Sequence, residues 1–384
     1  MKKKNKAIYL LFLMPFVYFA TACFVVWLVK TSGIYPSGSD TMYHVYRGDY
    51  VYNAIKSGNW YPLYDPAWYN GVEILRYWSP FPAYVMAFCQ YLAGGSQFGA
   101  YLFYIGGVCF LGACVWPFIG RGFNRPYLGA FIGLLWFFMP NNLCAIFIEG
   151  NLARSLSMIF LPVFIYSVYK YLYNHKLRYI PLMVFTFLLM ELCHLGYAGM
   201  VAIAVIIYGI VYMIQKGRKK AVLDVVISMI FGFMLLGIWL VASLRGGITS
   251  LDNSENMANF FQNLWITINP FERLTRGFEY FYFGFATLIV IVFGILFGYK
   301  KSRTGFVTGF IILLMTTKSA YAVLKHLPGS QYLWMLRFIS IALCMILMSF
   351  LMWDRLKKTL VLMLCVLLVV DTIPSLSLIV GEHN

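Results

Sequence analysis

Apolar runs recur from one end of the chain to the other, and most approach the roughly 20 residues that a helix needs to cross a bilayer. A membrane β-barrel would need alternating segments of about ten residues instead. The 384-residue chain is 61% hydrophobic and only 11% charged, which excludes a disordered protein and an ordinary soluble one. The sequence therefore predicts an all-α, polytopic membrane protein.

We expect about 11 transmembrane helices, with the N-terminus in the cytoplasm. This topology leaves two long extracytoplasmic loops, 31–96 and 244–277, and only short inner loops. No repeat or low-complexity linker divides the chain, so residues 1–384 are interpreted as a single integral membrane domain. The predicted spans are 7–29, 97–119, 127–147, 152–173, 179–193, 197–214, 221–243, 278–298, 305–320, 333–352 and 359–380.

The formal net charge of +16 comes from short basic clusters between the apolar runs. With a cytoplasmic N-terminus, all of these clusters fall on the inner side, as the positive-inside rule requires. This distribution argues against nucleic acid as a partner. The clusters are Lys2–Lys4, Arg121 with Arg125, Lys176 with Arg178, Arg218–Lys220, Lys300–Arg303 and Arg355–Lys358.

The first long loop differs in composition from the rest of the chain. Residues 31–80 hold nine tyrosines and three tryptophans but no phenylalanine, and they carry the acids Asp40, Asp49, Asp65 and Glu73. Tyrosine and tryptophan suit a wet membrane surface because each has an apolar body and a polar tip. We interpret this loop as the working part of a membrane enzyme. The apolar stretch that ends it, 81–96, is predicted to be an interfacial or re-entrant helix.

A helix is predicted within this loop. Ser37 to Thr41 is typical of a helix start, the spacing stays helical to Lys56, and Gly58 can end the helix. Asp40, His44 and Arg47 then share one face, at positions i, i+4 and i+7. Asp49 is roughly 180° around the helix from Asp40, so these two acids cannot serve one centre.

Asp40 is the candidate catalytic residue. The helix dipole favours a carboxylate at this end by about 0.3–1 kcal/mol. The charged form can take a proton from an attacking hydroxyl or hold a divalent cation beside a phosphate. His44 could bond Asp40, join a metal or contact the phosphate. The alternative is a capping aspartate beside an exposed histidine.

Other candidate binding residues lie near the outer ends of the predicted spans. Glu149, Arg154, His194 and Arg337 would each be costly inside hydrocarbon, about 2.5–3.5 kcal/mol for a charge, so we expect them to face a cavity or a partner. The two arginines could bind phosphate, or they could extend to the interface and serve no ligand. Trp60 belongs to an aromatic run that either anchors the loop among headgroups or stacks on a sugar or isoprenoid.

Several motifs resemble those of a known family. The chain is similar to bacterial membrane proteins identified as 6-pyruvoyl-tetrahydropterin synthase-related, which in turn resemble the GT-C class of polytopic glycosyltransferases. The pattern reads Gly38-Ser-Asp40, His44, Arg47, Gly58-Asn-Trp60-Tyr-Pro62, Trp68-Tyr-Asn-Gly71, Tyr77-Trp-Ser-Pro80, Glu149-Gly-Asn-Leu-Ala-Arg154 and Trp334-Met-Leu-Arg337-Phe.

The resemblance implies a GT-C-like fold and a sugar donor carried on polyprenyl phosphate at the outer face of a bacterial plasma membrane. An acidic residue in the first loop is the usual catalytic position of that class, and here it is Asp40. The first loop holds no firm Asp-x-Asp or Glu-x-Asp metal motif, and the chain ends just after its last predicted span, whereas many members of the class continue further.

The leading hypothesis is therefore an inverting glycosyltransferase that transfers the sugar to an extracytoplasmic acceptor, with Mg²⁺ or Mn²⁺ at Asp40 as an optional cofactor. A transporter or lipid flippase would instead show inverted repeats and broken helices at the midplane. A non-catalytic envelope-assembly protein would tolerate Asp40→Asn. The expected catalytic residues are Asp40 and His44, and the expected substrate-binding residues are Arg47, Trp60, Glu149, Arg154, His194 and Arg337.

Overall fold

The computed structural model describes residues 2–32, 38–68, 70–245, 284–326, 334–353 and 356–380. Within these ranges the structure is helical, and the only β-pairing is an isolated antiparallel bridge between Asp65 and Val72. The helices of the first half are α1 (Lys2–Thr31), α2 (Thr41–Lys56), α3 (Ile74–Tyr77), α4 (Phe81–Leu92), α5 (Gln97–Gly122), α6 (Pro126–Leu135), η1 (Trp136–Phe138), α7 (Pro140–Phe147), α8 (Leu152–Asn174) and α9 (Tyr179–Cys193).

The helices of the second half are α10 (Leu195–Lys216), α11 (Lys219–Leu235), α12 (Gly237–Arg245), α15 (Phe285–Phe297), α16 (Lys300–Met315), α17 (Lys318–Leu324), η4 (Met335–Arg337), α18 (Phe338–Met352), α19 (Lys358–Thr372), η5 (Pro374–Leu376) and α20 (Ser377–Val380). The all-α, multi-pass prediction is confirmed. The predicted second loop, 244–277, lies outside the described residues except for its first two.

In the described part of the chain, six helical segments are long and apolar enough to cross a membrane. The number rises to eight if each of two bent pairs is one span: α6 with α7, bent by 42°, and α11 with α12, bent by 64°. The predicted count of about 11 is not confirmed. Two of the predicted spans correspond to α9 and α15, whose 15 and 13 residues are fewer than a straight crossing needs.

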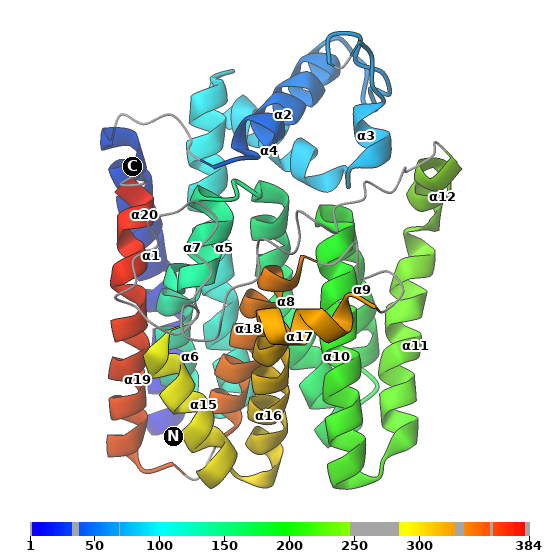
Figure 1. Ribbon diagram of the computed structural model, residues 1–384. Coiled ribbons are helices and arrows are strands. Elements are labelled where there is room, and N and C mark those ends of the chain that lie inside the picture. The colour runs from blue at the N-terminus through cyan, green and yellow to red at the C-terminus, as the bar shows by residue number, and fades with distance from the viewer. Residues whose placement is uncertain are drawn as a thin grey trace.

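The long helices form a bundle, and α2, α3 and α4 lie over one end of it (Figure 1). We call residues 38–68 and 70–92 the cap. The connections from α10 to α11 and from α15 to α16 lie at the opposite end of the bundle. These connections carry the basic clusters Arg218–Lys220 and Lys300–Arg303, so the clusters gather at the end away from the cap.

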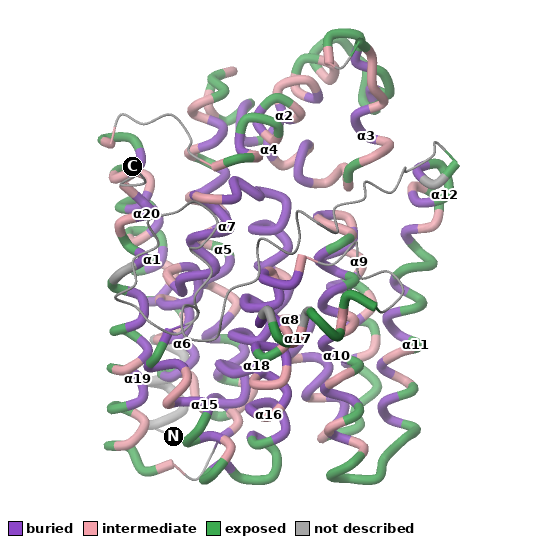
Figure 2. The backbone as a smooth tube through the Cα atoms, viewed as in Figure 1, coloured by how far each residue is buried: buried purple, intermediate pink, exposed green. Residues whose placement is uncertain are grey.

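Helices α8 and α18 form the centre of the bundle (Figure 2). In the most apolar stretch of α8, 83% is buried inside the protein, and the figure is 94% for Met335–Met352, which joins η4 to α18. A helix that is apolar on all sides is stable only when neighbours surround it, and α8 packs against α9 while α18 packs against α16. Helices α11 and α12 lie at the edge and expose apolar side chains such as Ile238, as expected next to lipid.

The cap has the helix that its sequence predicts. Helix α2 begins at Thr41 and ends at Lys56, and Gly58 follows with a φ of +86°, a left-handed value that suits glycine. The predicted apolar helix at 81–96 is α4, which packs against α2 and α5. Two tyrosines tie the α2–α3 connection to these helices: Tyr50 donates to the Tyr64 carbonyl at 2.6 Å, and Tyr84 to the Trp60 carbonyl at 2.7 Å.

Candidate functional site

A short backbone pairing joins the cap to the bundle. The amide of Ser39 donates to the Ile148 carbonyl at 3.0 Å, and the amide of Asp40 donates to the Glu149 carbonyl at 2.9 Å. The two segments can approach because Gly38 and Gly150 meet there. A Cβ on Gly38 would lie 2.7 Å from the Gly150 Cα, and both glycines have positive φ, +115° and +63°. This contact fixes Asp40 beside Glu149.

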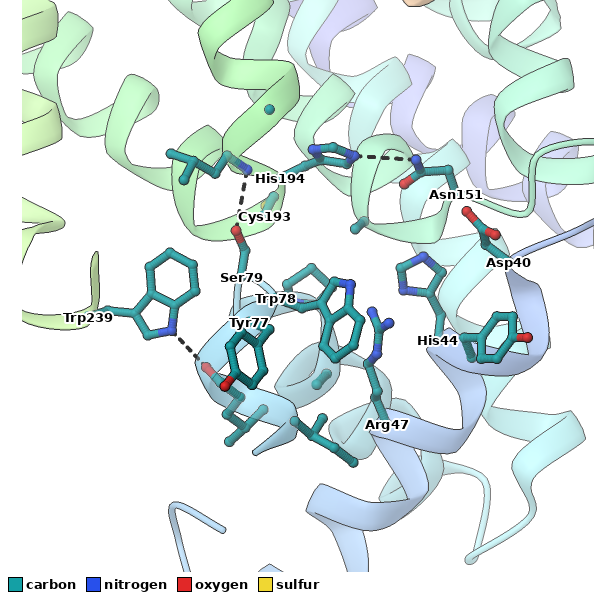
Figure 3. Close-up of a pocket in the computed structure, with 18 of the residues that line it drawn as sticks. Asp40, His44, Arg47, Tyr77, Trp78, Ser79, Asn151, Cys193, His194 and Trp239 are labelled. Atoms are coloured by element: carbon teal, nitrogen blue, oxygen red, sulfur yellow. Dashed lines mark hydrogen bonds between the residues drawn. The ribbon is translucent and has the colours of Figure 1, made fainter. Parts of the chain in front are cut away.

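Three helices begin at one cavity, which lies between the cap and the bundle and has a volume of about 510 Å³ (Figure 3). The residues that precede α2, α8 and α10 are Asp40, Asn151 and His194, and all three line it. Asn151 Oδ1 caps α8 by accepting from the Arg154 amide at 2.9 Å. His194 Nδ1 caps α10 by accepting from the Tyr197 amide at 3.1 Å. Because helix N-termini carry partial positive charge, their convergence favours an anionic ligand.

Aromatic rings form the wall that faces Asn151 and His194 across the cavity. Trp68 stacks in parallel with both Tyr43 and Trp78, with 5.7 Å between ring centroids in each pair. The guanidinium carbon of Arg47 lies 3.9 Å from the centroid of Trp78, a cation–π contact. The cavity therefore combines an apolar stacking surface with a cation, and both belong to the cap.

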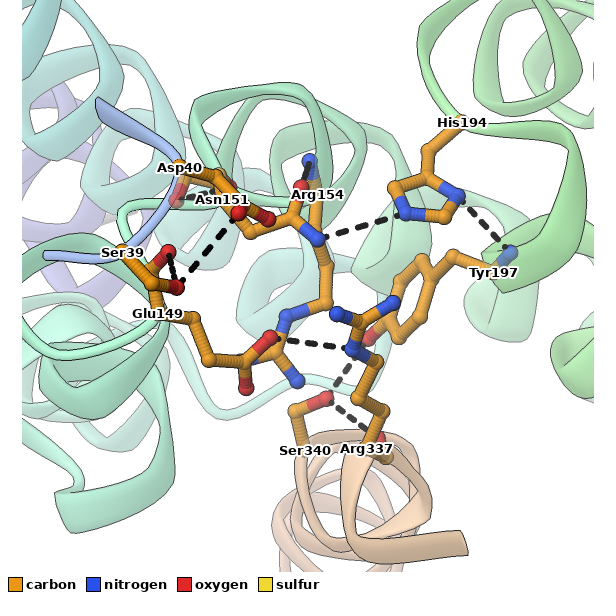
Figure 4. A network of polar contacts seen from close by, with 10 residues as sticks. Ser39, Asp40, Glu149, Asn151, Arg154, His194, Tyr197, Arg337 and Ser340 are labelled. Carbon is orange, nitrogen blue, oxygen red and sulfur yellow. Dashed lines mark hydrogen bonds and ion pairs between the residues drawn. The ribbon is translucent and has the colours of Figure 1, made fainter. Parts of the chain in front are cut away.

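Beneath the cap, one carboxylate holds two arginines (Figure 4). Glu149 Oε1 accepts from Arg154 Nη2 at 2.7 Å, and Oε2 accepts from Arg337 Nε at 2.9 Å. Arg154 is fully buried, whereas Arg337 lines the cavity. Near them, Tyr197 Oη and Ser340 Oγ lie 2.7 Å apart. Glu149 thus compensates a buried charge and positions Arg337 at the same time.

Burial and neighbouring charges shift the ionisable groups of the cavity. Burial raises the pKa of Asp40, although the nearby cations of Arg337 and Arg47 act in the opposite direction. Burial, followed by the Arg47 charge, holds the pKa of His44 well below its usual value. Burial also lowers the pKa of His194 to about 3, with smaller contributions from Arg337 and Arg154. Both imidazoles are therefore neutral near pH 7, and Asp40 is a stronger base than a free aspartate.

The structure gathers most of the predicted site residues but not all of them. Trp60 is 71% exposed and does not line the cavity, and Glu149 and Arg154 lie behind its wall. The roles predicted for these three in substrate binding stay predictions. The predicted residues that line the cavity are Asp40, His44, Arg47, His194 and Arg337.

Sequence reasoning missed several lining residues. Asn151 could have been found, because an asparagine directly before an apolar helical run is a typical N-cap. Trp78 belongs to the Tyr77-Trp-Ser-Pro80 motif, but the motif alone does not predict that its ring lines a cavity. Nothing in the sequence indicates that Trp239 lines the cavity. Its position in the wall depends on a hydrogen bond of 2.7 Å from its Nε1 to the carbonyl of Leu75, which lies far away in the chain.

The described residues contain no group of three or more His, Cys, Asp or Glu side chains arranged to hold a metal ion. Asp40 is the only acid among the described residues that line the cavity, and its charged neighbours there are Arg47 and Arg337. A divalent cation such as Mg²⁺ prefers several oxygen ligands. The divalent cation at Asp40 stays a prediction.

Comparison with known proteins adds a family to this geometry. Residues 75–379 match the 6-pyruvoyl-tetrahydropterin synthase related domain, which is described as a membrane protein. The chain belongs to this family. The part that matches the 6-pyruvoyl-tetrahydropterin synthase related family includes Glu149, Asn151, His194 and Arg337, whereas Asp40 precedes it. No curated protein and no solved structure matches the chain.

Proposed function

We propose that the protein is a membrane glycosyltransferase that moves a sugar from a polyprenyl-phosphate carrier to an extracytoplasmic acceptor. One observation carries the proposal: among the described residues, one carboxylate, two arginines and three helix N-termini face one cavity, and aromatic rings form one of its walls. The cationic groups suit the phosphate of the carrier. The rings suit the apolar face of a sugar, which can stack on an aromatic surface.

In the proposed reaction, an acceptor hydroxyl oxygen attacks the anomeric carbon of the sugar. The bond between that carbon and the carrier phosphate oxygen breaks, and its electron pair leaves with polyprenyl phosphate. Asp40 takes the hydroxyl proton, a task for which its raised pKa is an advantage near neutral pH. Arg337 and Arg47 stabilise the charge on the leaving phosphate. A single displacement inverts the anomeric configuration.

We further propose that the cap faces the outside of a bacterial plasma membrane and that the N-terminus is cytoplasmic. The basic clusters then lie on the inner side, as the positive-inside rule requires. The cavity lies at the boundary of cap and bundle, which in this orientation is near the level of the outer headgroups. A lipid-linked donor can reach it there while its chain stays in the bilayer.

The direct test is release of polyprenyl phosphate by the purified protein from a panel of polyprenyl-phosphate sugars, with candidate acceptors present. Asp40→Asn should lower the rate by about 10²–10⁴-fold, the usual contribution of a general base. Asp49→Asn is the matched control, because Asp49 accepts from Gln90 Nε2 at 2.6 Å on the other side of α2, and its rate should be unchanged.

Equal release by Asp40→Asn and wild type would contradict the role of Asp40. Folded protein that releases nothing from any donor would contradict the transferase. Protein reconstituted in vesicles tests the transport alternative. Movement of the intact lipid-linked sugar between leaflets, with no cleavage, would favour a flippase.

A further inference from the structure

Asn151 and His194 make an unusual pair at the cavity wall. Asn151 Nδ2 and His194 Nε2 lie 3.3 Å apart, and both side chains line the cavity (Figures 3 and 4). Asn151 is buried, with 4% of its surface exposed, and it is the residue directly before α8. His194 begins α10. The other hydrogen bonds of each residue determine what this contact can be.

In each side chain, the other polar atom already accepts a hydrogen bond from a backbone amide. His194 Nδ1 accepts from the Tyr197 amide, so it carries no hydrogen, and the neutral ring must carry its hydrogen on Nε2. Asn151 Oδ1 accepts from the Arg154 amide, so the amide nitrogen of Asn151 is the atom that faces His194. An amide flip would place two N–H groups against each other at the start of α8.

Two donors therefore face each other, because both Nε2 and Nδ2 carry hydrogen and neither can accept. A purely structural pair would need an acceptor on one side. A buried N–H group without an acceptor typically costs about 1–3 kcal/mol. Both groups gain an acceptor at once if a ligand oxygen binds in the cavity beside them, where the N-termini of α8 and α10 and the Arg337 side chain also favour negative charge.

We propose that Asn151 Nδ2–H and His194 Nε2–H form a two-donor site for an anionic oxygen of a phosphate group. The proposed function supplies one source, the phosphate of the polyprenyl carrier, and free inorganic phosphate is the other. Because both donors are neutral, the site adds binding without adding charge to the two arginines. Its role is to orient the phosphate relative to Arg337.

Asn151→Asp tests the donor assignment. An aspartate keeps the oxygen that caps α8, and it gives His194 Nε2–H an acceptor. We expect the ligand-free variant to unfold at a temperature no lower than wild type, and its affinity for phosphate to fall at least about tenfold. Asn53→Asp, an exposed change of the same charge on α2, should alter neither quantity. If His194 Nε2 were instead an acceptor, Asn151→Asp would place two acceptors together and lower the unfolding temperature, which would overturn the proposal.

The binding probes are inorganic phosphate and polyprenyl phosphate in detergent micelles, measured by calorimetry. Binding of polyprenyl phosphate alone assigns the site to the carrier. Binding of both, with mutual competition, assigns it to phosphate in general. If wild type binds neither, or if Asn151→Asp binds as tightly as wild type, the proposal fails. Asp40→Asn should still bind phosphate. Wild-type protein that binds phosphate but transfers no sugar would contradict only the proposed function.

Nitrogen-15 spectra of histidine-labelled protein give an independent readout. The His194 signal, assigned by its loss in His194→Gln, should show hydrogen on Nε2 and none on Nδ1. Titration should leave this signal unchanged down to about pH 5, because the pKa of His194 lies near 3. Hydrogen on Nδ1 would refute the donor pair, whatever the binding results.

Discussion

The cap and the centre of the bundle are stabilised by different interactions. The connection between α2 and α3 is tied by tyrosine hydroxyls that donate to backbone carbonyls, Tyr50 to Tyr64 and Tyr84 to Trp60. The centre, α8 and α18, is stabilised mainly by apolar contact, and two of its serines bond carbonyls of their own helices, Ser167 to Phe164 and Ser349 to Met345. Directional bonds determine the shape of the cap, whereas close packing determines that of the centre.

The candidate site lies where these two regions meet and draws on both. From the cap it takes Asp40, Arg47 and the stacked rings, which single hydrogen bonds and ring contacts position. From the bundle it takes Arg337, which depends on a buried carboxylate. Substitutions in the two regions should therefore have different effects. A substitution in the cap should disrupt the site and leave the fold intact, whereas a substitution among the buried charges should disrupt both.

The largest effect on stability is expected from Glu149→Gln. The change leaves Arg154 buried without its counter-charge, and breaking a buried pair on one side typically costs about 3–5 kcal/mol. Chemical unfolding in detergent measures the loss. Glu73→Gln is the control, because its ion pair with Arg76 is partly exposed and screened by solvent, so its loss should cost far less. Similar losses of unfolding free energy in both variants would show that the buried pairing of Glu149 with Arg154 and Arg337 adds no stability.

Gly150→Ala should separate the cap from the bundle. A Cβ at this position would collide with Thr41, and the φ of +63° is strained for alanine, so we expect a loss of more than about 1 kcal/mol. Protease sensitivity of the cap should rise while unfolding of the bundle changes less. Gly58→Ala is the control for φ alone, since nothing lies within 4 Å of a Cβ there. If the cap of Gly150→Ala stays resistant to protease, the contact between Gly38 and Gly150 is not what anchors it.

Tyr50→Phe removes one directional bond from the cap and leaves the ring. We expect a loss of about 0.5–1.5 kcal/mol, the usual net contribution of one hydrogen bond, confined to the α2–α3 connection. Hydrogen exchange of the amides in 57–73 should accelerate, and exchange in α8 and α18 should not. Uniform acceleration in both regions would mean that the cap and the centre unfold as one unit.

The smallest effect is a shift in the pH profile of the proposed reaction. Asp40 must be ionised to act as a base, so the rate should fall as pH falls through its raised pKa. Arg47 lowers this pKa, so Arg47→Gln should raise it and move the acidic limb to higher pH. Asp49→Asn should leave the limb where it is. A limb that does not move in Arg47→Gln would show that another group titrates there.

Sequence reasoning reached local features and missed those that depend on distant segments. The start and end of α2 followed from residue types at its ends, and the shared face of Asp40, His44 and Arg47 followed from helical spacing, which the cavity lining confirms. The burial of Arg154 could not be foreseen, because the Glu149 carboxylate that pairs with it also pairs with Arg337, which lies far away in the chain. Trp60 lies outside the cavity, in the turn after α2, where its side chain is exposed, and its predicted role in binding stays a prediction.

The anchoring of Asp40 through Glu149 to Arg337 has a consequence for biosynthesis. A ribosome adds about 5–20 residues per second, so roughly 15–60 seconds separate the appearance of Asp40 from that of Arg337. Early in that interval the nascent chain contains Asp40 but not yet Glu149. Later it contains Glu149 and Arg154, and Glu149 can then pair with Arg154 but not with Arg337. The site is therefore completed late, when η4, which carries Arg337, has been made, and a chain arrested before that point would contain Asp40 without the Arg337 cation.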